Sequence, residues 1–139
     1  MQPAPVLSIA AAVTLVAIAV GAAACASAPS TGAPKEVVER GKALYEANCR
    51  SCHGGASGGA LRDIPPPHNN NGHTWHHADQ LLIDIVLNGV SIPNYEWKMP
   101  RFKDTLTEAD AQAIIAHIKS WWTADQRAFQ ATATAQYGT

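Results

Sequence analysis

Two cysteines and a histidine stand close together in the motif CRSCH at residues 49–53. Paired thiols at this spacing occur in redox-active sites and in halves of zinc sites. A redox pair does not need the adjoining histidine, and an all-cysteine zinc site needs a second pair, which a chain with three cysteines lacks. The motif instead predicts attachment of c-type haem, with thioethers from Cys49 and Cys52 to the haem vinyl groups and the His53 imidazole on the iron.

Met99 offers a second iron ligand, because it lies in a proline-bearing loop C-terminal to that motif. A neutral thioether stabilises ferrous relative to ferric iron and so raises the reduction potential. Methionine often only fills gaps in a core, which is the plain alternative. We expect ligation, with Pro100 stiffening the loop. A bis-histidine state is the rival, and its candidates are His68, His73, His76, His77 and His117.

The His53 imidazole needs a partner for its second ring nitrogen. A ligating imidazole usually donates that N–H to a carbonyl, which fixes the tautomer and the ring orientation. The rigid run of prolines at residues 65–67 offers such carbonyls, and we expect Pro66 to accept. The alternative is that these prolines only shape the loop.

Three more histidines gather in the motif HTWHH at residues 73–77. If this stretch is helical, His73, His76 and His77 share one face and could bind copper or zinc as a second metal site. The alternative is the start of a helix with neutral, exposed imidazoles and Trp75 folded over the haem. A helix N-terminus disfavours the imidazolium form.

The chain has 139 residues and a formal net charge of −1, which fits one domain and gives no sign of a nucleic-acid partner. Residues 1–34 carry no charged side chain, and residues 1–24 resemble an export signal or membrane anchor without its usual positive start. Cys25 could be lipidated, the signal could be cleaved at an Ala-x-Ala site, or the segment could stay as an uncleaved anchor. Each outcome predicts a periplasmic location or the outer face of the cytoplasmic membrane.

Residues 25–34 are rich in small residues and read as a flexible linker. Apolar positions at helical spacing then predict helices over 35–48, 78–88 and from residue 107 to about 122. Gly41 inside the first helix costs roughly 1 kcal/mol, which makes sense if another backbone crosses there. Loops at 54–72 and 90–105 separate these helices, and a short helix and frayed tail follow at 124–139. The fold class is therefore all-α.

These residues together resemble a class I cytochrome c over about residues 36–122. The likeness rests on Gly41 and Tyr45, the CRSCHG stretch, the prolines, Met99 and the order of the helices. It implies three main helices around one covalently bound haem, in a domain at 35–123. In that family the first and last helices cross at a glycine and are packed by an aromatic residue from each. Here His117 falls at the second aromatic position, so Trp121 or Trp122 could carry that packing.

The resemblance also implies one-electron transfer between redox proteins that dock weakly at an exposed haem edge, without enzymatic activity. Trp97 and Arg101 are the candidates to hold a haem propionate; core packing and a solvated surface are their plain alternatives. Two rival functions stay open. One is a sensor or enzyme subunit with an open iron site, and the other is a copper-linked redox protein using His73, His76 and His77.

Overall fold

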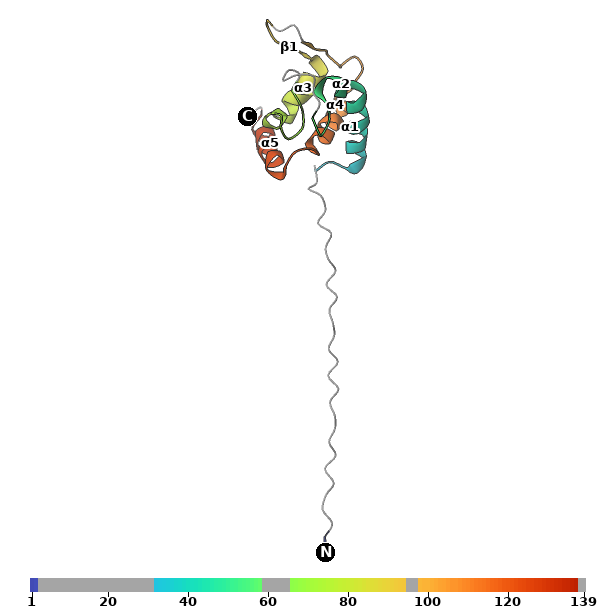
Figure 1. Ribbon diagram of the computed structural model, residues 1–139, viewed down its shortest axis with the longest axis vertical. Helices are drawn as coiled ribbons and strands as arrows, with labels where there is room; N and C mark the ends of the chain where they lie inside the picture. The colour runs from blue at the N-terminus through green and yellow to red at the C-terminus, as the bar shows by residue number, and fades with distance from the viewer. Residues whose placement is uncertain (3–31, 59–65, 95–97, 138–139) are drawn as a thin grey trace.

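The computed structural model describes residues 1–2, 32–58, 66–94 and 98–137. Most of this chain is helical, as the sequence predicted (Figure 1). The elements are α1 Lys35–Asn48, α2 Arg50–His53, the 3₁₀ turn η1 Thr74–His76, α3 Asp79–Asn88, β1 Val90–Ser91, β2 Lys98–Met99, α4 Glu108–Lys119 and α5 Ala124–Gln136. The first three predicted helices correspond to α1, α3 and α4; α1 has the predicted bounds, and the ends of the other two differ by at most three residues.

The first and fourth helices form the principal packing contact of the domain. They cross at Gly41, where a Cβ would lie 1.8 Å from the carbonyl oxygen of Ala113. Only a residue without a side chain permits this approach, which explains a glycine inside α1 despite its poor helix propensity. The crossing buries a core that α3 completes from the other side. Its members are Tyr45, Cys49, Leu82, Ile83, Val86, Leu106, Ala111, Ile114, Ile115, Ile118 and Trp122.

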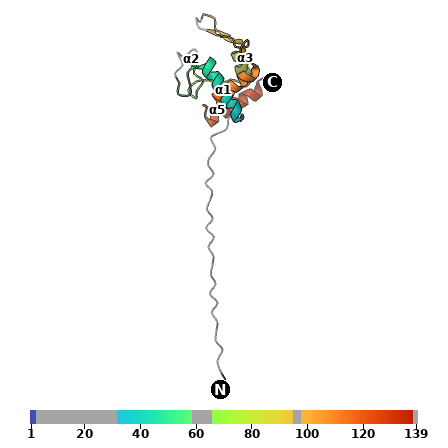
Figure 2. The ribbon, with the colours of Figure 1, turned by 90° about the vertical axis from the view of Figure 1, so that its right-hand side faces the viewer.

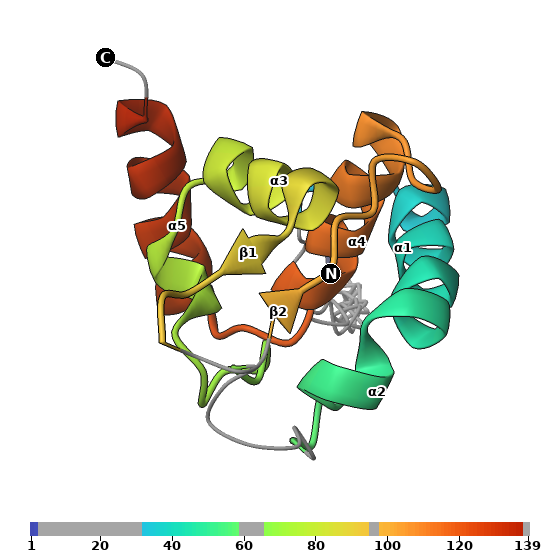
Figure 3. The ribbon, with the colours of Figure 1, turned by 90° about the horizontal axis from the view of Figure 1, so that it is seen from above.

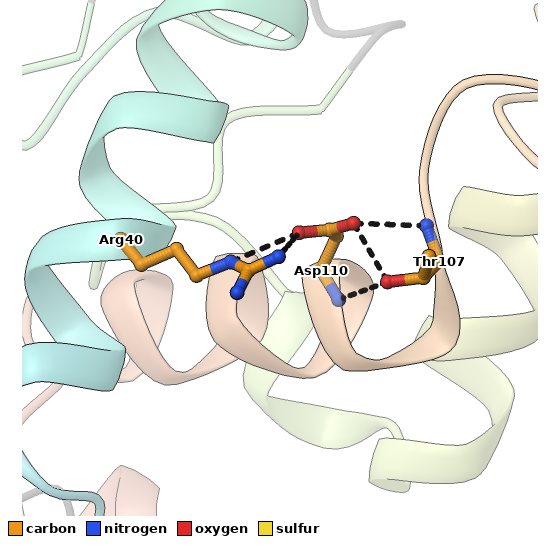
Figure 4. Close-up of polar contacts among 3 residues, drawn as sticks. All are labelled: Arg40, Thr107 and Asp110. Carbon is orange, nitrogen blue, oxygen red and sulfur yellow. Dashed lines mark hydrogen bonds and ion pairs between the residues drawn. The ribbon is translucent and has the colours of Figure 1, made fainter.

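The start of α4 is tied to α1 by a polar cluster of three side chains (Figure 4). Thr107 caps the helix, accepting a hydrogen bond from the Asp110 backbone N–H while the Asp110 carboxylate accepts from the Thr107 N–H. Arg40 of α1 donates to the same carboxylate at 2.5 Å. Hydrogen bonds from Thr107, and then the Arg40 guanidinium, lower the pKa of Asp110 to about 2. The carboxylate therefore stays ionised and links the two helices.

The C-terminal helix α5 lies on the far side of the domain from α1, as two views at right angles show (Figures 1 and 3). The helix expected from residue 124 is present, but it is longer than predicted, because α5 continues past Ala131 to Gln136. Buried polar contacts account for the extra length. Gln130 is buried and its amide nitrogen lies 2.6 Å from Asp79 Oδ1, while Thr134 Oγ1 accepts from the Asp79 N–H. These contacts attach the helix to the start of α3.

A short antiparallel ladder joins Val90 to Met99 and Ser91 to Lys98, in a region that was predicted to be a loop. Each strand has only two residues, which is too short for an alternating pattern to be detected. The expected export segment and most of the linker lie outside the described residues. Within the described residues, no helix has both the length and the apolar character needed to cross a membrane.

Candidate functional site

One cavity of about 420 Å³ brings together the side chains that the sequence singled out. Cys49, Cys52 and His53 line it from the CRSCH motif, and Met99 lines it from β2. Its size lies within the range of ligand-binding sites. The rest of its wall is mainly apolar and comes from α3, α4 and the hairpin, through Leu82, Ile85, Val86, Val90, Ile92, Phe102, Ile114, Ile115 and Ile118. The cavity is therefore suited to a large apolar group with a few polar attachment points.

The two cysteines of the motif have different surroundings. Cys49 is buried between α1 and α2, whereas Cys52 is exposed on α2. Burial, with a smaller contribution from Cys52, raises the pKa of the Cys49 thiol to about 11. Redox-active CxxC pairs depend on a thiol whose pKa is lowered. The buried Cys49 thiol lacks the lowered pKa of such a pair.

His53 is buried at the end of α2 and has one ring nitrogen already engaged. Its Nδ1 lies 2.7 Å from the carbonyl oxygen of Pro66, the acceptor named from the sequence. Burial lowers the pKa of the ring and so favours its neutral form, which carries one N–H. Because a carbonyl oxygen can only accept, that N–H is at Nδ1 and donates a hydrogen bond to Pro66. The other nitrogen, Nε2, is then an unprotonated donor atom on a residue that lines the cavity.

Met99 is partly buried and is held in place by the loop that follows it. The N–H groups of Phe102 and Lys103 donate to the carbonyl of Leu87 at the end of α3. Gly89 ends α3 with φ of 75°, and a Cβ there would lie 2.5 Å from the Met99 carbonyl oxygen. Glycine is thus required both by its backbone conformation and by the close approach of the Met99 strand.

Tyr45 supports the CRSCH motif through a hydrogen bond that could not be predicted from the sequence. Its hydroxyl donates to the carbonyl of Gly54 at 2.9 Å, and the side chain is fully buried. Burial raises the pKa of this phenol well above its ordinary value, so it stays protonated. Its ring meets Trp121 edge-on at 5.0 Å and His117 at 5.8 Å. Both residues share the aromatic packing that the resemblance assigned to one position of the last helix.

His68 also proved closer to the site than its sequence position indicated. Its ring stacks on that of His53, with centroids 4.1 Å apart, and its Nδ1 lies 2.8 Å from Thr74 Oγ1. Burial is the main cause that lowers the pKa of His68 to about 3. A histidine directly after three prolines gives no periodic pattern, so no local signal could have placed it against His53.

The three histidines of the HTWHH motif do not come together as a triad. His73 and His77 face one another, with centroids 5.6 Å apart, and both line the cavity. His76 instead packs on Trp75 at 3.7 Å. The expected helical face is lost because only residues 74–76 form a 3₁₀ turn and His77 is extended. Across the described part of the chain, no three His, Cys, Asp or Glu side chains are arranged to hold a metal ion.

The two residues suggested for a propionate remain predictions. Trp97 lies outside the described residues. Arg101 is exposed and forms an ion pair with Asp104 at 3.0 Å, and it is not among the residues that line the cavity.

A helical domain with a CxxCH motif at the wall of an apolar cavity defines a c-type cytochrome domain. The chain belongs to the family described as cytochrome C oxidase, cbb3-type, subunit III, whose model matches residues 36–118. It is also 25% identical over 99 residues to one subunit of the nicotinate dehydrogenase of Pseudomonas putida. That match covers 70% of this chain but only 8% of the relative, so the chain spans less than a tenth of that protein. No solved structure matches the chain.

Membership of this family implies a haem cofactor and electron transfer through it. The residues present fit such a group on structural grounds. The cavity offers two thiols, the Nε2 of a histidine oriented by Pro66, and a methionine from the facing strand. Nitrogen and thioether ligands of this kind are those that low-spin haem iron takes in electron carriers.

Proposed function

We propose that this chain is a monohaem electron carrier, with haem attached through Cys49 and Cys52 and with His53 and Met99 as the axial ligands. The observation that carries the proposal is that all four side chains line one cavity. When bound, haem supplies the one-electron couple of its iron. Thioether formation needs no added oxidant, because each S–H adds across one vinyl group, with sulfur going to one carbon and hydrogen to the other.

The remaining chemistry belongs to the chain. The Pro66 carbonyl holds the proton of His53 on Nδ1 and leaves Nε2 free to bind iron. The Met99 thioether, a neutral and soft ligand, favours the ferrous state and raises the potential. Ile114, Ile115 and Ile118 of α4 exclude water from the site. If His53 and Met99 both held the iron, no position would be left on it for a substrate, and the domain would act as a carrier and not as an enzyme by itself.

Its partners, in this proposal, are exported or membrane-bound redox proteins that dock weakly where the cavity reaches the surface. Ile92 lines the cavity and is 39% exposed, which makes it a contact for such docking. The likeness to a segment of a dehydrogenase subunit supports a role in accepting electrons from an oxidising enzyme. We propose a location on the outer side of the cytoplasmic membrane, with attachment through Cys25 or the N-terminal segment. Mass spectrometry of the purified protein tests covalent haem, the mature N-terminus and any lipid together.

The axial ligands are tested by replacing Met99 with alanine in the holoprotein. We expect loss of the ferric sulfur-to-iron charge-transfer band, a lower midpoint potential, and binding of carbon monoxide to the reduced protein. Lys98→Ala, at the exposed neighbouring position that also lines the cavity, is the matched control and leaves the charge-transfer band and the carbon monoxide binding unchanged. An unaltered spectrum and potential in Met99→Ala would overturn the His53/Met99 assignment and favour an open-site or bis-histidine protein.

A further inference from the structure

The C-terminal segment contacts the cavity through the loop at residues 66–78, and this segment lies beyond the family match, which ends at residue 118. Three side chains spaced four residues apart donate to backbone carbonyls of that loop. Trp122 Nε1 donates to the carbonyl of His68 at 2.9 Å, and Gln126 Nε2 donates to that of Asn70 at 2.8 Å. Gln130 Nε2 lies 3.2 Å from the carbonyl of His77. The donors thus contact the start of the loop, at His68 and Asn70, and its end, at His77.

Burial makes the two outer contacts important. Trp122 is 3% exposed and Gln130 is 1% exposed. Removing the donor would leave a carbonyl without its partner in a region that water does not reach freely, which is unfavourable. The Gln130 amide also lies 2.6 Å from Asp79 Oδ1, so the same group joins the loop to the first residue of α3. The loop cannot shift without breaking these bonds.

Hydrogen bonds within the loop and to a neighbouring turn hold its backbone in place. Asn69 is buried and donates to the carbonyl of Ala56, and its own carbonyl accepts from the Gly72 N–H at 3.0 Å. Trp75 Nε1 donates to the carbonyl of Gly72 at 2.8 Å. Because these bonds link residues 69–75 to one another, we expect a displacement of the C-terminal donors to reach the start of the loop.

The start of the loop is where the contact with His53 is made. Pro66 accepts from His53 Nδ1 at 2.7 Å, and two residues later the His68 ring stacks on the His53 ring. The carbonyl that Trp122 contacts is that of His68 itself. Two hydrogen bonds and the two peptide units between Pro66 and His68 therefore connect Trp122 to the His53 imidazole.

We propose that Trp122, Gln126 and Gln130 are positioning residues for His53, which hold the Pro66 carbonyl against Nδ1 and thereby set the reduction potential. The inference rests on the proposed function, since it requires His53 as an iron ligand. A carbonyl held close to Nδ1–H makes the imidazole a stronger donor to iron and favours the ferric state. Loosening the loop weakens that hydrogen bond, so the midpoint potential rises.

The test uses full-length holoprotein with Trp122→Phe, Gln130→Met and the double variant. Phenylalanine keeps an aromatic ring but has no N–H, and methionine keeps the length of glutamine without its amide. We expect an upward shift of the midpoint potential in each variant, largest in the double variant. We also expect an upfield shift of the His53 Nδ1 proton in the NMR spectrum of the reduced protein. Gln112→Met is the control, because Gln112 is an exposed glutamine bonded only to Glu108 in the same helix.

Several outcomes decide the matter. An unchanged potential and Nδ1 proton in Trp122→Phe, with haem and the methionine–iron band intact, overturns the positioning role. So does an equal shift in Gln112→Met. If Gln130→Met does not fold, Trp122→Phe carries the test alone. Lack of covalent haem or of the methionine–iron band in the unaltered protein would instead overturn the proposed function.

Discussion

The wall of the cavity that carries Cys49 and His53 is anchored in the helical core, whereas the wall that carries Met99 is a two-residue ladder near the surface. Cys49 and His53 are buried, and the α1–α4 crossing and the Tyr45 hydroxyl support them. Met99 is only partly buried. Segments with few buried contacts open at lower cost than the core. The difference indicates that the methionine side is the labile half of the site.

On the side of the cavity that carries Cys49 and His53, the largest effect is expected from filling the crossing of α1 and α4. Gly41→Ala would gain about 1 kcal/mol of helix propensity if the site were open. Because the new Cβ would lie 1.8 Å from the Ala113 carbonyl oxygen, we expect a net loss in the free energy of unfolding. Overpacking of this kind typically costs about 1–3 kcal/mol. Urea unfolding measures it, with Ala43→Gly as an exposed control on the same helix. A more stable Gly41→Ala protein would show that the helices do not cross closely.

The second wall is tested at Gly89. Gly89→Ala combines an unfavourable backbone conformation with a clash against the Met99 carbonyl, so we expect the methionine–iron band to disappear at lower denaturant concentration while helical circular dichroism persists. Gly32→Ala is a matched control, because Gly32 has a similar φ of 77° but a Cβ there would have no atom within 4 Å. If band and helicity are lost together in both variants, the two walls do not differ in stability.

The acid stability of the first wall depends on Asp110. The pKa of this carboxyl is about 2 in the folded chain against an ordinary 3.8, chiefly through hydrogen bonds from Thr107. The stabilisation is complete above pH 3.8 and is lost as the pH falls from 3.8 to about 2. In Asp110→Asn, the free energy of unfolding should therefore fall less steeply as the pH decreases through this range. Asp104→Asn, in an exposed ion pair, should leave the slope as it is.

A smaller dependence of stability on pH is expected from His117, whose ring packs against that of Tyr45. Burial, and to a lesser degree Lys42, lowers the pKa of this ring below 6.5. As the pH falls below 6.5, the unfolded chain takes up a proton that the folded chain resists, so stability falls with decreasing pH and is complete above 6.5. His117→Phe should reduce this slope in thermal unfolding between about pH 6.5 and 5. An identical slope in the variant would contradict a buried neutral imidazole.

The sequence was sufficient where local chemistry decides structure. The CRSCH spacing, the Thr107 cap and the Gly41 crossing could be read from residue types alone, and α1 has the bounds that its periodicity predicted. The hairpin could not be predicted, since two-residue strands carry no period. The length of α5 depends on the buried amide of Gln130, a contact with residues more than 50 positions away. The placement of His68 and the separation of His76 from His73 likewise depend on tertiary packing.

The direction in which the chain enters the domain has a consequence for access. Helix α1 begins at Lys35 at one end of the domain, and the hairpin of β1 and β2 projects from the opposite end in two perpendicular views (Figures 1 and 2). A tether made through the N-terminus would therefore leave the Met99 rim turned outwards, free to meet another molecule from the bulk phase.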